Sequence, residues 1–552
     1  MPNDAYRAPV PDPVPTRKPL IAMPTAHLMA LAPLDVWARL LLGARGVHAR
    51  YWLRLAFALV CSGAGMACCV IERVLLCPVR LVKFGKDAVF DHPPGVVIVV
   101  GYYRSGTTHL HNLLSCDPRV VTPRWYQVLA PQGFWLGWSL VRIMLVPFLG
   151  STRPQDGVAF GPEWPAEDDF ALCNWGLCST LPGRFVFPSA WERWSRWNTL
   201  DGLSERQKNR WRSLTAMLCW KLTRAKRGRV LVLKTPSHTG RILELDRLFA
   251  GRARFVHIAR DPEKVIDSNV NMHLRLRGHL LEDGPCAQTI RDRIVDEYEA
   301  LETVCAEQLA AIDPARVVRI RHMDLVHNPM GELTKMHATL GLDWSDDARG
   351  RTARYLHEIG TYRTPSEKRS GELGQQSERE RGLCAHLRAL HRLDEAPVDP
   401  IALPDRASEQ EPRRSFGRGV LGALVVAAVF VLLWVGLVAA HNSVFPDNHS
   451  RFNQLVWVMG ALIGLGAHRF ARGGSVALGL AAALVTLLAW VGATYWAIDI
   501  VWDHGNGGWD TVYHNFRGVW VGTTSPTVFV FGVLAHLTAY RQASRRGPNP
   551  PG

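Results

Sequence analysis

Short apolar runs rich in β-branched residues recur through the middle of the chain. Residues 96–100 read Val-Val-Ile-Val-Val, and comparable runs occupy residues 229–234, 254–260 and 317–321. Runs of this length are too short for helices and are typical of buried strands. Helical signals alternate with them, so the pattern predicts an α/β domain over residues 91–395.

The C-terminal part of the chain has a different pattern. After a polar linker over residues 396–418, long apolar runs predict an all-α transmembrane region of about four helices over residues 419–552. The alternative is a large soluble helical core. The four candidate spanning helices are residues 420–440, 455–467, 475–498 and 525–540.

The arginines around these runs predict an orientation. They cluster before the first run, between the second and third, and after the fourth, whereas the loops 441–453 and 499–518 each carry one arginine. Basic loops stay on the cytoplasmic side of a membrane. We therefore expect a multi-pass inner-membrane protein whose catalytic domain faces the cytoplasm.

The N-terminal residues 1–90 begin with a proline-rich tail and then become helical and basic. Residues 55–71 form an apolar run of 17 residues with basic residues on both sides. Such flanks disfavour a membrane crossing. We expect a helix that is buried against the following domain or lies on a membrane surface, with a crossing helix as the alternative.

Charge and cysteine content narrow the class of partner. The 552 residues include 64 basic and 49 acidic side chains, a formal charge of +15. This excess suits an anionic cofactor or a membrane surface, and no nucleic-acid-binding motif accompanies it. The 11 cysteines include no C-x-x-C pair. This pattern indicates that the cysteines serve as small apolar side chains in a reducing compartment, and we expect no metal site.

A glycine-rich segment follows the first predicted strand. Residues 101–108 read Gly-Tyr-Tyr-Arg-Ser-Gly-Thr-Thr, and a helix start comes next. A strand, a glycine loop and a helix N-terminus together form a cradle for an anion. Thr107 stands where nucleotide-hydrolysing loops carry lysine, which argues against ATP or GTP. Arg104 supplies a cation inside the loop instead.

This segment resembles the 5′-phosphosulfate loop of sulfotransferases, in which P-[KR]-S-G-T-T follows the first strand. Residues 104–108 match the core of that motif, and Tyr103 replaces the usual proline. The resemblance implies a P-loop-like α/β domain with a parallel sheet, and the sulfuryl donor 3′-phosphoadenosine-5′-phosphosulfate. By the resemblance, the ligands of the 5′-phosphate side are Arg104, Ser105, Gly106, Thr107 and Thr108.

A second motif follows the predicted strand 254–260. Arg260 ends the strand, Asp261-Pro262 opens a helix, and Ser268 comes eight residues after the arginine. The spacing is similar to that of the 3′-phosphate motif of sulfotransferases, which implies that Arg260 and Ser268 bind the 3′-phosphate. A guanidinium fork matches phosphate oxygens, and a hydroxyl adds a directed donor.

Lys234 ends another predicted strand. Open α/β sheets bind ligands beyond the carboxyl ends of their strands, so we expect Arg104, Lys234 and Arg260 at one edge. The segment 233–238 is similar to L-K-[ST]-P-x-H of bacterial sulfotransferases. We expect Lys234 to neutralise charge on the bridging oxygen as its bond to sulfur breaks. The alternative is a solvated lysine after a strand.

The general base is expected among clustered acids. Residues 163–170 resemble the P-x-E-D-[ED]-F-A-L segment of bacterial sulfotransferases, and clustering raises the pKa of one carboxylate. Glu167 is the first candidate and Asp168 the second, with helix capping as the alternative. A glutamate common after the glycine loop in relatives is missing. His109 and His111 could also serve.

The sequence thus predicts a membrane-anchored sulfotransferase that acts on a hydroxyl group. The acceptor stays open among lipids, glycans and small metabolites. Two alternatives from other classes are a P-loop kinase-like enzyme, which would need magnesium and ATP, and a non-catalytic nucleotide-binding membrane scaffold.

Overall fold

The structure is a computed structural model. It describes residues 27–44, 46–83, 95–135, 161–224, 229–359, 373–396 and 416–444, together with residues 463, 467, 478 and 480–489.

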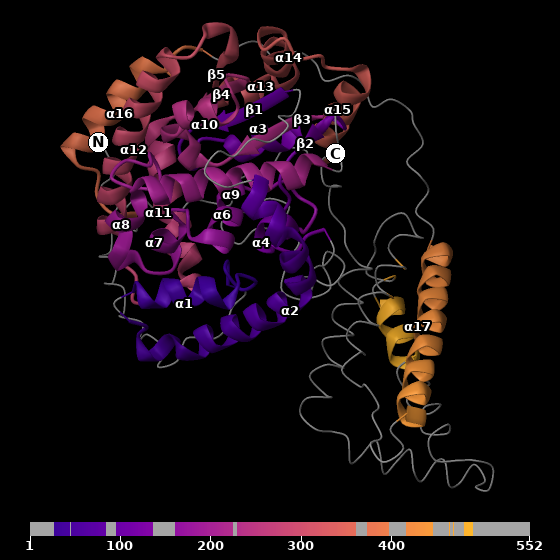
Figure 1. Cartoon of the computed structure of the whole chain (residues 1–552). Helices are drawn as coiled ribbons and strands as arrows, with labels where there is room; N and C mark the ends of the chain where they lie inside the picture. The colour runs from indigo at the N-terminus through magenta and orange to yellow at the C-terminus, as the bar shows by residue number, and fades with distance from the viewer. Residues whose placement is uncertain are drawn as a thin grey trace, which may run out of the picture.

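The α/β domain contains a five-stranded parallel sheet (Figure 1). Its order is β2-β3-β1-β4-β5, and every neighbouring pair is parallel. The four predicted strands are confirmed, and the predicted α/β class with them. The strands are β1 (Gly95–Val100), β2 (Val120–Val121), β3 (Val230–Lys234), β4 (Ala253–Ala259) and β5 (Val317–Arg321).

Apolar side chains cover both faces of the sheet because alternate residues of each strand point to opposite sides. In β1, Val96 and Ile98 belong to the larger core, whereas Val97 and Val99 belong to the smaller one. The helices that contribute to the smaller core are α3 (Thr107–Leu114), α13 (His322–His327), α14 (Pro329–Thr339) and α15 (Asp346–Ile359).

The larger core fills the opposite side of the sheet. The helices there are α4 (Trp125–Leu129), α6 (Asp168–Gly176), α7 (Leu181–Phe185), α8 (Trp191–Ser195), α9 (Glu205–Arg224), α10 (Ile242–Leu248), α11 (Pro262–Arg275), α12 (Ala287–Ala310) and α16 (Glu378–Leu390).

Two N-terminal helices, α1 (Leu34–Leu42) and α2 (Trp52–Lys83), pack on the same core. Trp37 and Leu55 are buried there. Glu72 of α2 forms a buried ion pair of 2.5 Å with Lys221 of α9. Burial lowers the pKa of Lys221, although the Glu72 carboxylate opposes that shift. The run 55–71 therefore lies in a helix packed against the domain, one of the two arrangements expected.

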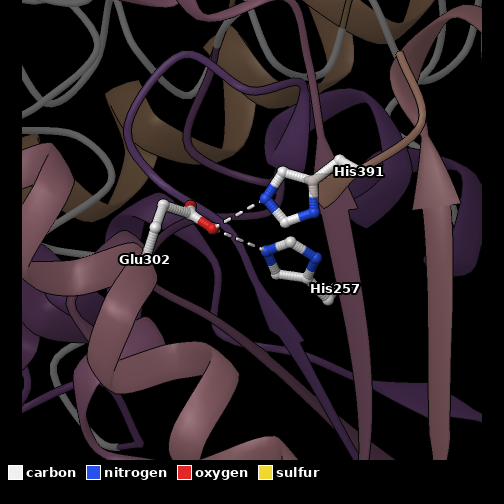
Figure 2. A group of neighbouring side chains, drawn as sticks. All are labelled: His257, Glu302 and His391. Carbon is white, nitrogen blue, oxygen red and sulfur yellow. Dashed lines mark hydrogen bonds and ion pairs between the residues drawn. The ribbon is translucent and has the colours of Figure 1, made fainter. Parts of the chain in front are cut away.

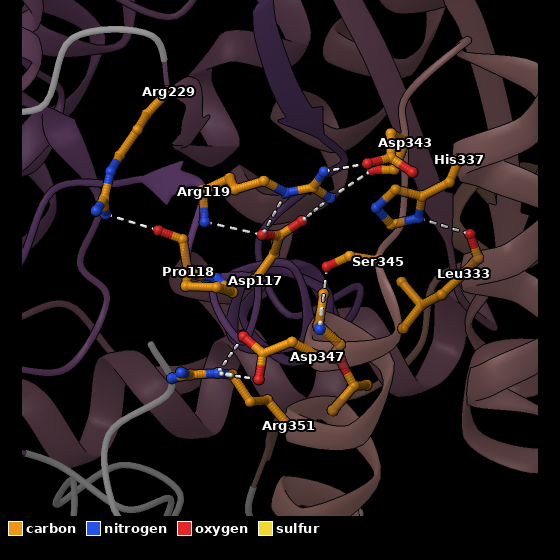
Figure 3. Close-up of polar contacts among 12 residues, drawn as sticks. Asp117, Pro118, Arg119, Arg229, Leu333, His337, Asp343, Ser345, Asp347 and Arg351 are labelled. Carbon is orange, nitrogen blue, oxygen red and sulfur yellow. Dashed lines mark hydrogen bonds and ion pairs between the residues drawn. The ribbon is translucent and has the colours of Figure 1, made fainter.

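Polar contacts fix the edge strand β2 (Figure 3). Arg119 is bound to Asp117 at 2.7 Å and donates to the Asp343 carbonyl oxygen, also at 2.7 Å. Arg229, just before β3, donates to the carbonyl oxygen of Pro118 at 2.6 Å. These contacts join the turn before β2 to the loop between α14 and α15 and to the strand beside it.

The membrane prediction is corrected by the structure. The run 420–440 lies in α17 (Phe416–Val444), whereas the expected helices at 455–467, 475–498 and 525–540 lie wholly or largely outside the described residues. Within the described part of the chain, no helix is both long enough and apolar enough to cross a bilayer. A spanning helix needs about 20 mainly apolar residues. The predicted multi-pass inner-membrane location is therefore wrong, and the predicted transmembrane region and membrane partner lack support.

Candidate functional site

The glycine loop, residues 101–108, joins β1 to α3. Gly101 and Gly106 have φ angles of 144° and 103°. A Cβ atom at Gly101 would lie 2.6 Å from the carbonyl oxygen of Ile258, and one at Gly106 would lie 2.2 Å from Cδ2 of His322. Only glycine fits these positions without strain. The loop is therefore pressed closely against β4 and α13.

The loop is hydrogen-bonded to the elements that carry the second predicted motif. Arg104 donates from Nε to Oγ of Ser268 at 3.0 Å, and Arg260 donates to the carbonyl oxygen of Arg104 at 3.1 Å. Asn269 of α11 donates to the carbonyl oxygen of Tyr103 at 2.7 Å. The predicted 5′-phosphate and 3′-phosphate residues thus lie in direct contact, although they are far apart in sequence.

The other side of the loop is held by the segment after β3. The Gly101 N–H donates to Oγ1 of Thr239 at 2.9 Å. The Tyr103 hydroxyl lies 3.1 Å from the hydroxyls of Thr180 and Ser237, and the guanidinium of Arg184 lies 3.9 Å from the centre of its ring. Tyr103, which replaces proline in the motif, is therefore an anchor of the loop.

Lys234 connects the loop to the acidic segment. It ends β3, and its side chain is 2% exposed. Its Nζ donates to Oγ1 of Thr108 at 3.2 Å and forms an ion pair of 2.7 Å with Oε1 of Glu167. The predicted catalytic lysine, one loop threonine and the first candidate base therefore meet at the carboxyl end of β3.

Glu167 and Asp168 have different surroundings. Glu167 precedes α6, its side chain is 20% exposed, and among the described residues it makes no capping hydrogen bond. Asp168 is buried, accepts a hydrogen bond from Thr235 at 3.0 Å, and lies 2.9 Å from Nε2 of His238. Burial acts to raise the pKa of Asp168, but His238 and Thr235 hold it below its usual value. The pKa of Asp168 is therefore lowered, and Glu167 is the more exposed of the two carboxylates, at 20% against 1%.

The next carboxylate, Asp169, has a structural environment. It is buried, pairs with Arg241 at 3.0 Å and accepts a hydrogen bond from Ser179. Its N–H donates to Oγ1 of Thr235 at 3.2 Å. These contacts bind the start of α6 to the segment after β3, and so they fix the position of Glu167 beside Lys234.

The histidines near the loop are held neutral. Burial lowers the pKa of His109 to about 4, and burial together with the charge of Lys234 lowers the pKa of His111 well below its usual value. Burial and the nearby Arg260 lower the pKa of His322 to about 3. In the described part of the chain, Nδ1 of His322 is buried without a hydrogen-bond partner. His322 directly follows β5, so its place at this edge could have been read from the predicted strand 317–321.

The side chain of Ser105, another predicted ligand, is buried. Its Oγ is buried and lies 2.9 Å from the position that a Cβ atom of Gly101 would take. Its N–H donates to the carbonyl oxygen of Tyr102 at 3.2 Å. The remaining predicted site residues lie in the loop, at the adjacent strand ends, in the helix that follows β4, or at the start of α6: Arg104, Gly106, Thr107, Thr108, Glu167, Asp168, Lys234, Arg260 and Ser268.

Comparisons with known proteins identify similar chains. Residues 174–346, which contain β3 to β5, match a model of the sulfotransferase family. The chain is 32% identical over 291 residues to the omega-hydroxy-beta-dihydromenaquinone-9 sulfotransferases of Mycobacterium bovis and Mycobacterium tuberculosis, covering 52% of this chain and 73% of theirs. The crystal structure of a sulfotransferase from Mycobacterium tuberculosis is 18% identical, with a TM-score of 0.47 over 65% of this chain and 90% of that one. The crystal structure of a sulfotransferase from Mycobacterium avium is 17% identical, with a TM-score of 0.47 over 67% of this chain and 98% of that one.

Proposed function

The chain belongs to the sulfotransferase family, and from this premise we propose that it moves a sulfuryl group from 3′-phosphoadenosine-5′-phosphosulfate to a hydroxyl of a small-molecule acceptor. One observation carries the proposal. Nζ of Lys234 lies 3.2 Å from Oγ1 of Thr108 in the glycine loop and 2.7 Å from Oε1 of Glu167. A cation thus stands between an anion-binding loop and a carboxylate.

The residues at the loop suit the two phosphate groups of this donor. Thr107 and Thr108 open α3, where backbone N–H groups and the helix dipole favour an anion. Arg104 adds a cation beside the Ser268 hydroxyl, and Arg260 adds a second one beside the Arg104 carbonyl oxygen. In the proposed complex, the loop and α3 hold the 5′-phosphate, and Arg260 with Ser268 holds the 3′-phosphate.

The proposed reaction is a single in-line displacement. The acceptor oxygen forms a bond to sulfur, the bond from sulfur to the 5′-phosphate oxygen breaks, and the electron pair of that bond stays on the phosphate. Glu167 takes the proton of the acceptor hydroxyl, and Lys234 offsets the charge that develops on the leaving oxygen.

The ion pair couples these two roles. Nζ of Lys234 lies 2.7 Å from Oε1 of Glu167 before the reaction. As negative charge builds on the phosphate side, Nζ is drawn toward it and away from Glu167. This movement frees the carboxylate to accept the proton of the acceptor hydroxyl.

The acceptor that we propose is a hydroxyl on a lipophilic small molecule. The curated relatives are named for a hydroxylated dihydromenaquinone. Aromatic side chains lie near the proposed base in this chain: the rings of Trp125 in α4 and Phe170 in α6 are 4.9 Å apart, and both are partly exposed. They offer an apolar surface close to Glu167.

Ligand-dependent thermal unfolding and product analysis test this function. Adenosine 3′,5′-bisphosphate, the expected product, should raise the melting temperature of the full chain by binding the native state, and ATP with magnesium should do so far less. Incubation with the donor and hydroxylated quinones should release the bisphosphate and increase the acceptor mass by one sulfuryl group. Equal stabilisation by both nucleotides, or by neither, would contradict the proposed donor.

A further inference from the structure

Two histidines and a glutamate meet in the larger core, away from the residues assigned above (Figure 2). His257 comes from β4, Glu302 from α12, and His391 from the end of α16. Their side chains are 3%, 5% and 12% exposed. One ligand atom from each residue lies within 4.8 Å of those of the other two. The arrangement joins three elements that are distant in sequence.

The distances in this cluster suit a small divalent metal ion. Oε2 of Glu302 lies 3.3 Å from Nε2 of His257 and 3.2 Å from Nε2 of His391. Zinc binds nitrogen and oxygen at about 2.0–2.2 Å with tetrahedral geometry, so ligand atoms around it lie roughly 3.3–3.6 Å apart. Two of the three separations are therefore close to those between zinc ligands.

The polar atoms of the cluster are incompletely satisfied without an ion. Among the residues that the structure describes, Nε2 of His257 is buried and makes no hydrogen bond, although it lies 3.3 Å from Oε2 of Glu302. Metal binding requires an ionised carboxylate and imidazole lone pairs. An ion between the three side chains would use all of these atoms at once.

We propose that His257, Glu302 and His391 form a zinc site. Two imidazoles and one carboxylate are a ligand set that zinc accepts, with one position left for water. The competing state has no ion and pairs the carboxylate with a protonated histidine. The cysteine pattern predicts no metal site, and this proposal revises that expectation.

The proposed site would join α16 to the elements that support the glycine loop. Arg388 of α16 pairs with Asp261 at 3.1 Å, and Asp261 caps the helix that carries Ser268. Tyr298, one turn before Glu302 in α12, stacks on Tyr102 of the loop with ring centres 4.4 Å apart. A zinc ion would therefore stabilise the scaffold behind the phosphate-binding residues without touching the donor.

Metal analysis of the full chain tests the proposal. The protein is purified with a tag that lacks histidine, treated with chelator, reloaded with zinc and desalted. We expect about one tightly bound zinc per chain, the stoichiometry of a three-ligand site. His391→Gln and Glu302→Gln should each lose at least about nine tenths of it, since each removes a ligand. The matched control is His386→Gln, an exposed histidine on the same helix, which should keep it.

Two further measurements keep the test decisive if a variant folds poorly. Cobalt bound to the wild-type protein should give the visible absorption of a four-coordinate site. Zinc should raise the melting temperature of the wild type and of His386→Gln but not of His391→Gln. The proposal is overturned if the wild type retains no zinc after desalting, if cobalt gives only the spectrum of its aquo ion, or if the ligand variants keep the zinc content of the control.

Discussion

Lys234 and Glu167 form an ion pair of 2.7 Å in which the lysine is buried and the glutamate is 20% exposed. The pair joins the carboxyl end of β3 to the start of α6. Because the carboxylate is the exposed member of the pair, an acceptor can approach Glu167. Lys234 instead contacts Thr108 in the glycine loop. This asymmetry separates the two proposed roles and allows them to be tested one residue at a time.

Glu167→Gln should lower kcat by about 10²- to 10⁴-fold, the usual contribution of a general base. Affinity for adenosine 3′,5′-bisphosphate, measured by calorimetry, should stay close to that of the wild type because the carboxylate faces the acceptor side.

Asp168→Asn, at the second candidate base, is the variant to compare with Glu167→Gln. It breaks a buried contact with His238, so we expect a loss of about 1–3 kcal/mol in the free energy of unfolding. If Glu167→Gln keeps normal turnover while Asp168→Asn folds normally but is inactive, the general base is Asp168 and not Glu167.

Lys234→Met should act mainly on the chemical step. Methionine fills much of the space of the buried side chain but carries no charge, so turnover at saturating donor should fall by about 10²- to 10³-fold. Binding of the bisphosphate should change much less because the charge matters most in the transition state. Steady-state kinetics with calorimetry separates the two effects. A variant that loses affinity while its turnover at saturation stays unchanged would contradict the catalytic role.

Arg260→Ala should weaken donor binding. The variant removes a charged hydrogen-bonding group, so affinity for the bisphosphate should fall by about 1.5–3 kcal/mol, tenfold or more. It also removes the hydrogen bond to the Arg104 carbonyl, so the loop loses one support. Arg252→Ala, which alters an exposed arginine at the other end of β4, is the control and should bind normally. Equal affinity in both variants would remove Arg260 from the proposed phosphate site.

The fold was predictable where the signal is local. Buried parallel strands are continuous apolar runs, so β1, β3, β4 and β5 could be read from sequence. The edge strand β2 has two residues and leaves no such run. It is held beside β3 by two hydrogen bonds, from Arg229 to the Pro118 carbonyl oxygen and from the Val230 N–H to the Arg119 carbonyl oxygen. Contacts of that kind depend on the folded arrangement and cannot be seen in a linear pattern.

The candidate site divides in the same way. The motifs around Arg104, Lys234 and Arg260 are contiguous, and the parallel topology places their strand ends together. His238 and Thr239, which hold Asp168 and Gly101, come from the short 3₁₀-helix Pro236–Gly240 after β3, and no sequence spacing links them to their partners. The sequence ranked Glu167 before Asp168, and burial separates the two in the structure, because Asp168 is buried whereas the Glu167 side chain is 20% exposed.

Acidification should destabilise the protein through its buried histidines. Burial, with a smaller effect of His279, lowers the pKa of His27 to about 3. In the unfolded chain the pKa is about 6.5, so below that pH the unfolded state binds the proton and the folded state does not. The free energy of unfolding therefore falls as pH drops from about 6.5 toward 3, with about 2 kcal/mol already lost near pH 5 through this one group. Other buried histidines act with the same sign: His109, His111, His273, His279 and His322.

His27→Gln isolates one of these contributions. The variant loses the ring contacts to His279 and Met29, so it should be less stable than the wild type at neutral pH. The difference between its unfolding free energies at about pH 7.5 and about pH 5 should nevertheless be smaller by about 2 kcal/mol, because a titrating group is gone. Urea unfolding at the two pH values measures this, with exposed His386→Gln as the control that keeps the wild-type difference. An unchanged pH difference in His27→Gln would show that His27 is protonated in the folded protein.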